Sequence, residues 1–246
     1  KLFVMFGVAE DHDSNPIKIG LGKLKARGTR VISVNPVRTG YSAVADDWIG
    51  ITPGTDGLLI LALIHCLLEA GKIDLDYLAQ WTNAPLLITE ADGPEKGLFV
   101  RNAESQPFVI DRATSHPAPW DGKGVQPDLG ADWQGNRTVF RHMVEEYLKP
   151  DHAPEAVAAR CGVTATRIRQ LAAELADVAF NQAITVDRPW TDFRGNEHPN
   201  MPGRPVSFHA MRGISAHSNG FQTARALHLL QILLGAVETP GGYRLK

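Results

Sequence analysis

The chain has 246 residues, of which 43% are hydrophobic and 21% charged, so it can bury the sizeable core of a globular protein. Its 25 Lys and Arg residues nearly balance 27 Asp and Glu residues, and the net charge of −2 gives no long-range attraction to nucleic acid or to an anionic membrane. The two cysteines, Cys66 and Cys161, lie far apart, which argues against a disulfide framework or a cysteine-ligated cluster within the chain.

The first predicted element is the apolar run Leu2–Phe6, which ends at Gly7 and is typical of a buried parallel strand. Ile17–Lys25 has the periodicity of a helix, and Val31–Val34 is a second apolar strand, so the three form a β-α-β unit. No secretory signal is visible. Because the chain opens in a strand without an initiator Met, we expect it to be excised from a longer prokaryotic polypeptide of the cytoplasm or periplasm.

A strand at Trp48–Thr52 and a long helix reaching about Ala70 follow, and Asp74–Trp81 is a further helical segment. This alternation predicts an α/β protein with an open, mainly parallel, doubly wound (Rossmann-like) sheet flanked by helices. Later in the chain the patterns predict helices at 137–148, 154–161, 165–175 and 223–234 and a strand at 183–186.

Three parts are expected along the chain. Residues 1–90 form the nucleotide-binding β-α-β part, and residues 136–246 add helices and strands that complete the same α/β unit. Between them, residues 91–135 are rich in Gly, Pro, Asp and Trp and are predicted to form a loop-rich hairpin insertion, with strand-like pieces at Leu98–Arg101 and Phe108–Asp111. The sequence leaves open whether this insertion lines a substrate funnel, contacts another protein chain or is a plain surface loop.

Polar turns follow three of the predicted strands, at Gly7–Ser14, Asn35–Thr39 and Pro53–Asp56. In open α/β sheets, ligands bind outside the carboxyl ends of the strands, so these turns predict a nucleotide site. The first turn suits phosphate through its backbone, whereas its acidic side chains Glu10 and Asp11 would have to reach ribose hydroxyls or base N–H groups.

The other two turns carry side chains that can form hydrogen bonds with a nucleotide. Asn35 can donate and accept hydrogen bonds, and Arg38 can meet a phosphate or a carboxylate. Asp56 begins a helix, where a carboxylate is stabilised and can accept from the N1–H and N2–H₂ groups of guanine. Taken singly, each turn is explained by ordinary capping and turn chemistry. Glycine-rich G-x-G-x-x-G and Walker loops are absent, which argues against an ordinary NAD or ATP site.

Three blocks of the chain resemble the molybdopterin oxidoreductases of the dimethyl sulfoxide reductase type, and they occur in the order typical of that family. The first holds a "(D/N)PR-x-T"-like turn, an "AD" pair and "PGTD"; the second is a helix pair; the third follows "G-x-x-x-H-x-N-G". Here they read NPVRTGYSAVADDWIGITPGTD, EAVAARCGVTATRIRQLAAELA and GISAHSNGFQTARALHLLQILLGAVETPGG.

This resemblance implies that the chain binds a guanine dinucleotide arm of a bis(molybdopterin guanine dinucleotide) molybdenum cofactor. It implies that Gly7, Glu10, Asn35, Thr39 and Asp56 surround one guanosine, with Asp11, Pro36, Arg38, Gly54 and Thr55 in the same turns. It further implies that His217, Asn219 and Gly220 line the approach to a pterin.

Two departures from the family pattern bear on activity. The first turn reads Gly7-Val8-Ala9-Glu10 where the family often has "G-x-N". The family's cysteine cluster, molybdenum ligand and C-terminal domain have no counterpart here, so no catalytic or metal-binding residue is assigned and the fragment alone is expected to be inactive. We expect the iron–sulfur cluster outside this chain.

The resemblance also implies partners. They are the rest of the large subunit, an iron–sulfur subunit that transfers electrons and, in some relatives, a membrane anchor subunit. The loop DRPWTDFRGNEH resembles the branch that transfers oxygen atoms or sulfur to and from sulfur compounds, such as sulfite dehydrogenases and thiosulfate or polysulfide reductases.

Other functions stay open as alternatives. A stand-alone nucleotide-binding domain or a helix-turn-helix DNA-binding domain is one, since Ala158, Gly162 and Ile168 have that spacing and arginines lie nearby. The apolar pattern of the second helix favours packing instead, and no nucleic-acid partner is expected. Weaker alternatives are a metal site, a hydrolase and a thiamine-diphosphate domain. The histidines lack H-x-x-x-H spacing and no G-x-S-x-G elbow is present.

Overall fold

The computed structural model describes residues 1–8, 17–38 and 40–244. The chain divides into two compact units, each built from segments that are separate in the sequence. Unit 1 consists of Lys1–Ile73, Lys149–Val186 and Pro202–Lys246, and unit 2 consists of Asp74–Leu148 and Asp187–Met201. The ranges predicted from the sequence, 1–90, 91–135 and 136–246, do not coincide with these units and stay a prediction about domains.

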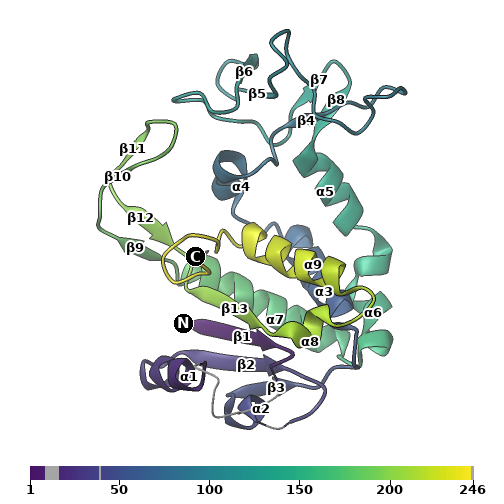
Figure 1. The fold of residues 1–246 in the computed structure, drawn as a ribbon, viewed down its shortest axis with the longest axis vertical. Helices are drawn as coiled ribbons and strands as arrows, with labels where there is room; N and C mark the ends of the chain where they lie inside the picture. The colour runs from purple at the N-terminus through teal and green to yellow at the C-terminus, as the bar shows by residue number, and fades with distance from the viewer. Residues whose placement is uncertain (9–16, 39, 245–246) are drawn as a thin grey trace. The chain divides into compact units, whose positions relative to one another are not determined.

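Unit 1 contains the main sheet, which has four parallel strands among the described residues (Figure 1). The strands lie in the order β13-β1-β2-β3, and their bounds are Leu2–Phe6 (β1), Arg30–Val34 (β2), Asp47–Ile49 (β3) and Val206–Ala210 (β13). Phe6 is paired with both Val34 and Ala210, and Val34 with Ile49, so all four strands end at the same edge.

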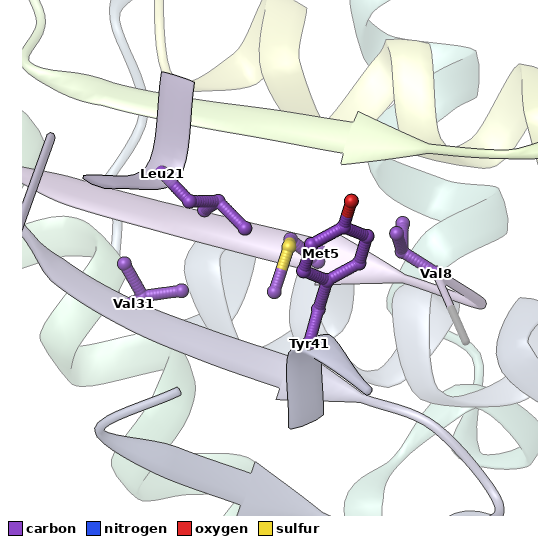
Figure 2. Close-up of a cluster of buried hydrophobic side chains, with 5 residues drawn as sticks. All are labelled: Met5, Val8, Leu21, Val31 and Tyr41. Carbon is purple, nitrogen blue, oxygen red and sulfur yellow. The ribbon is translucent and has the colours of Figure 1, made fainter. Parts of the chain in front are cut away.

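One face of this sheet is covered by α1 (Ile17–Ala26) and α2 (Tyr41–Val44). A buried cluster joins them to β1 and β2 (Figure 2). Leu21 of α1 and Tyr41 of α2 pack against Met5 and Val31 of the strands and against Val8. Burial of these apolar side chains, at roughly 1.5–3 kcal/mol for each large one, fixes the helices on the sheet.

The central helix of unit 1 is α3 (Asp56–Glu69), which is apolar on nearly every side and buried over most of its length. A helix of this composition must be surrounded by other elements. It packs against α6 (Pro154–Cys161), α7 (Ala165–Ala176) and α9 (Gly220–Leu233). The remaining elements of unit 1 are the 3₁₀-helix Pro150–His152, the π-helix Asp177–Asn181, the short helix α8 (Arg212–Ser215), and a strand pair of β9 (Ile184–Val186) with β12 (Met201–Gly203).

Unit 2 combines two helices with short antiparallel strands around a small core of Leu87, Ile110 and Ala131. Its hairpin β10–β11 is organised by Asp192, which accepts hydrogen bonds from the Arg194 and Asn196 amides and the Asn196 side chain, and bonds to His198. Its elements are α4 (Leu75–Trp81), β4 (Leu87–Ile88), β5 (Phe108–Ile110), β6 (Pro117–Pro119), β7 (Asp132–Trp133), β8 (Asn136–Thr138), α5 (Val139–Tyr147), β10 (Trp190–Thr191) and β11 (Glu197–His198).

The structure confirms an α/β fold with a parallel sheet and flanking helices. Some details differ from the sequence predictions. β3 stops at Ile49 rather than Thr52, the predicted strand at Leu98–Arg101 forms only isolated bridges, and the last helix begins at Gly220 instead of Thr223. The strand β13 is not among the predicted elements. Among the described residues, the helices are too short or too polar to cross a membrane.

Candidate functional site

The residues after β1 and β2 lie next to each other at the carboxyl edge of the main sheet. The Gly7 amide donates to the Val34 carbonyl at 3.0 Å, and the Asn35 amide donates to the Ile49 carbonyl at 3.1 Å. The first and second predicted turns therefore begin side by side, as expected for a ligand site at strand ends. Glu10, Asp11 and Thr39, which are predicted to belong to these turns, lie outside the described residues.

The backbone conformation of Gly7 favours glycine, and α8 lies against it. Its φ of +63° is in the left-handed region that favours glycine. A Cβ atom there would lie 3.5 Å from the Ile214 amide nitrogen, so α8 closely approaches this turn. Sequence reasoning missed Gly213 and Ile214 because it did not recognise β13, the strand that leads into them.

Asn35 is the most informative residue at this edge because one of its polar groups has no partner. Its side chain is 2% exposed, and Oδ1 accepts from the Val37 amide at 3.1 Å, which fixes the turn. The Asn35 carbonyl accepts from the Trp48 indole at 2.9 Å. The Nδ2 group is buried and has no hydrogen-bond partner among the residues that the structure describes. An unpaired buried donor costs about 1–3 kcal/mol, which a ligand acceptor would recover. The neighbouring Pro36 and Arg38 are exposed.

The third turn lies between β3 and the buried helix α3. Gly54 has φ +78°, and the Thr55 hydroxyl donates to the Thr52 carbonyl at 2.6 Å, so this side chain does not cap the helix. Asp56 begins α3 and is 8% exposed. Burial raises the pKa of its carboxyl, although its own backbone amide and the nearby His217 favour the ionised form.

The "HxNG" segment is brought to this third turn from far along the chain. The Nδ1 atom of the exposed His217 would lie 3.5 Å from a Cβ on Gly54. Asn219 precedes α9, and its carbonyl accepts from the Thr223 amide at 3.0 Å and the Thr223 hydroxyl at 3.2 Å. Gly220 has a structural reason to be glycine, since a Cβ there would be 2.0 Å from the Ser215 carbonyl oxygen.

Comparison with known proteins is consistent with this geometry. The family model described as molybdopterin oxidoreductase matches residues 1–246. The chain belongs to the molybdopterin oxidoreductase family. It is 43% identical to a sulfite dehydrogenase subunit of Allochromatium vinosum over 264 aligned residues, which cover 100% of this chain and 27% of that protein.

Two more distant proteins also match most of this chain over a small part of their own length. The formate dehydrogenase major subunit of Haemophilus influenzae is 26% identical, with 89% of this chain and 19% of that protein covered. The acetylene hydratase structure from Pelobacter acetylenicus superposes with a TM-score of 0.59 at 15% identity, covering 98% of this chain and 22% of that one, and this likeness concerns the fold. The chain thus spans about a fifth to a quarter of the length of these relatives.

Family membership implies a molybdopterin cofactor with molybdenum, and it confirms the resemblance seen in the sequence. The residues at the carboxyl edge fit the organic part of such a group: a buried amide donor without a partner, glycine turns that allow close approach, and a buried carboxylate. Among the described residues, no group of three or more His, Cys, Asp and Glu side chains is placed to hold a metal ion.

Two cavities in the described structure lie elsewhere. One, of about 340 Å³, lies between the end of α3 and α7 and is lined by Cys66, Ala172 and Phe180 among others. The other, of about 430 Å³, is an open hollow on the β10–β11 hairpin of unit 2. Neither cavity includes the turns at the carboxyl edge of the main sheet.

The helix pair α6–α7 is explained by packing. Ile168 and Leu171 are buried in unit 1. Arg169 pairs with Glu69 and Glu155 at 3.0 Å, and Arg167 pairs with Asp47. These two arginines are engaged with carboxylates of the same chain, which favours packing of α7 over the exposed recognition helix of a helix-turn-helix domain.

Proposed function

We propose that this chain holds one guanine dinucleotide arm of a bis(molybdopterin guanine dinucleotide) cofactor at the carboxyl edge of its main sheet. The observation that carries the proposal is the buried, unpartnered Nδ2 group of Asn35, which lies beside Gly7 where the first two strands end. A nucleotide would supply the acceptor that this donor lacks.

Strand order supports the same location. β2 and β3 lie on one side of β1 and β13 on the other, so the connections change direction between β1 and β13. Open, doubly wound α/β sheets of the Rossmann-like kind bind ligands in the crevice at this switch point. Gly7 follows β1 and Gly213 follows β13, and the Gly7 carbonyl would lie 3.2 Å from a Cβ on Gly213. We infer that this sheet belongs to that class.

We propose that Asp56 recognises the guanine base. Its carboxylate is at the amino end of α3, where partial positive charge favours an anion, and it would accept from the N1–H and N2–H₂ groups of guanine. Gly54 and Thr55 would form the floor of this subsite, with Pro36 and Arg38 at its rim. His217, Asn219 and Gly220 would line the approach to the pterin, since His217 lies against Gly54.

In the complete enzyme the cofactor would supply the redox chemistry, and this chain would bind and orient it. The 43% identity to a sulfite dehydrogenase subunit supports oxygen-atom or sulfur transfer on a sulfur compound. Relatives named as subunits support partner subunits, for which we propose the rest of the large subunit, an iron–sulfur subunit that transfers electrons, and a membrane anchor. The iron–sulfur cluster would lie outside the 246 residues.

Calorimetric titration of the complete apoprotein with GDP, guanosine and ADP tests the proposal. GDP and guanosine should bind more tightly than ADP, because adenine lacks the two donor groups that Asp56 accepts. Asp56→Asn should weaken GDP and guanosine by about tenfold to a hundredfold, the loss expected for hydrogen bonds to a charged acceptor.

Asp151→Asn, which changes an exposed carboxylate in the 3₁₀-helix, is the matched control and should bind like the wild type. If GDP, guanosine and ADP bind equally well, or if Asp56→Asn leaves all affinities unchanged, guanine recognition at this turn is wrong.

A further inference from the structure

Unit 2 carries a continuous patch of aromatic side chains, which we call the aromatic patch. It consists of Trp81 at the end of α4, Trp120 after β6, and Trp190 and Phe193 of the β10–β11 hairpin. The ring centroid of Phe193 lies 5.9 Å from that of Trp81 and 6.1 Å from that of Trp120. Trp81 and Trp190 are 5.7 Å apart. All but the half-buried Trp190 are exposed, and contiguous exposed apolar surface of this kind marks a site of association.

The side chains and loops of unit 2 hold the aromatic patch in a fixed arrangement. The Arg194 guanidinium lies 4.8 Å from the centroid of the Phe193 ring and donates to Gln80 of α4 at 2.5 Å. The Gly124 amide donates to the side chain of Asn196 at 3.0 Å, which ties the loop after β6 to the hairpin. Because the rings are held in place before a partner binds, binding loses less conformational entropy.

A hollow beside the aromatic patch leaves room for a side chain of a partner. It is the cavity of about 430 Å³ on the β10–β11 hairpin, and its walls include Trp190 and His198, whose stacked rings have centroids 4.4 Å apart. Pro189 and Pro199 add apolar surface to these walls. Protein interfaces concentrate their binding energy where tryptophan and arginine side chains surround such a concavity. The patch therefore suits a protein surface from which an apolar side chain projects.

The charge near the aromatic patch argues against a nucleic acid or a membrane as the partner. Charged side chains of both signs belong to the segments that form the patch, namely Asp121, Lys123, Arg194 and Glu197. Nucleic acids and anionic membranes are bound by surfaces on which positive charge dominates. A surface of mixed charge with an aromatic centre fits another protein surface better.

The occupant that fits best is the remainder of the same polypeptide. The chain covers 27% of the sulfite dehydrogenase subunit to which it is 43% identical, so nearly three quarters of such a subunit lies outside these residues. A surface tethered to the patch by a short flexible linker has an effective concentration on the order of millimolar. A second copy or a separate subunit reaches the patch only at its concentration in solution, so the tethered surface has the advantage.

We propose that the aromatic patch is the docking surface for an apolar region of the large subunit outside these 246 residues. This inference rests on the larger subunit named under the proposed function and is independent of cofactor binding. The occupant would cover Phe193 and Trp120 and would place an apolar side chain in the hollow beside Trp190.

Photochemical cross-linking of the complete large subunit tests this inference. Phe193→p-benzoylphenylalanine places a photoreactive group in the aromatic patch, and irradiation should join it to a peptide of the same polypeptide outside the 246 residues, as mapped by mass spectrometry. Leu98→p-benzoylphenylalanine is the matched control, because Leu98 also belongs to unit 2 and is 59% exposed against 62% for Phe193. The control should give at least tenfold less of this product. If the first variant does not fold, Trp120→p-benzoylphenylalanine provides the same readout.

The other outcomes contradict the proposed occupant. A product of twice the mass of the subunit would show that a second copy covers the patch, and a cross-link to a different chain would show a separate subunit. Links confined to the 246 residues, or equal yields from Phe193 and Leu98, would overturn the docking surface itself. Titration with GDP is a separate measurement, so guanine binding can fail while the covered patch stands, and the reverse.

Discussion

At the scale of single residues, Asp56 is subject to two opposing effects. The amino end of α3 favours its ionised form, and burial disfavours that form more strongly, so the pKa of the carboxyl is raised. A carboxylate that must be ionised to accept two hydrogen bonds from guanine is thereby made sensitive to acid. The same raised pKa means that folding stability falls as the pH rises above the ordinary pKa of an aspartate, and the loss is complete once the pH exceeds the pKa in the folded state.

Guanosine binding should therefore weaken as the pH falls through the raised pKa of Asp56, because the protonated carboxyl accepts fewer hydrogen bonds. Titrations of guanosine over a series of pH values measure this. Asp56→Asn should show weak binding with no dependence on pH in that range.

Stability should change in the opposite sense. Since the folded-state pKa is raised, the free energy of unfolding should fall as the pH rises from the ordinary pKa of an aspartate to the raised one, and Asp56→Asn should remove this slope. If the slope persists in the variant, another group causes it.

At the scale of elements, the start of α9 depends on close contact between backbones. Gly220 begins the helix directly against Ser215, the last residue of α8. Because the atom in the way of a Cβ is a backbone carbonyl, no side-chain rotation relieves the contact. By contrast, Gly22 in the exposed part of α1 has nothing within 4 Å of a Cβ position.

Gly220→Ala should lower the free energy of unfolding by about 1–3 kcal/mol or more, the cost typical of overpacking. Gly22→Ala should raise it by about 0.5–1 kcal/mol, because alanine favours a helix over glycine. Urea denaturation followed by circular dichroism compares the two. Equal effects of the two substitutions would show that the α8–α9 contact is not tight.

Elements with local signals were predictable from the sequence. Pro154 at the first turn of α6 and Gly162 after its end, with φ +75°, mark both ends of that helix. The strand β13 was missed although Val206 and Phe208 alternate with polar residues, because it is short, follows a Pro-rich loop and pairs with a strand at the other end of the chain.

For the site as well, features set by local sequence were predictable and long-range contacts were not. Strand-end turns at Gly7 and Asn35 were predictable because a turn follows its own strand. The approach of His217 to Gly54 is a tertiary contact that no local pattern reveals.

At the scale of the whole molecule, the candidate site belongs to unit 1 alone. The described site residues fall in Lys1–Ile73 and Pro202–Lys246, and none falls in unit 2. Four of the five tryptophans, Trp81, Trp120, Trp133 and Trp190, lie in unit 2. Because all the described site residues lie in unit 1, a ligand at this site should affect unit 1 and not unit 2.

GDP should slow amide hydrogen exchange in unit 1, at residues 35–38 and 54–58, and leave exchange in unit 2 unchanged. A ligand at a hundred times its Kd stabilises the form that it binds by about 2.7 kcal/mol. Exchange measured by mass spectrometry with GDP or ADP at equal concentration tests this, and slower exchange confined to unit 2 would place the nucleotide elsewhere.

The pairing of β1 with β13 joins the first residues of the chain to residues more than 200 positions later, with Leu2 opposite Val206. On the ribosome, β1 is synthesised before β13 and lacks its second neighbour until the residues between them have been added. Until then one of its edges is open to pairing with other chains. Such long-range pairing slows folding, so we expect the unpaired edge of β1 to be most open to association with other chains before β13 is in place.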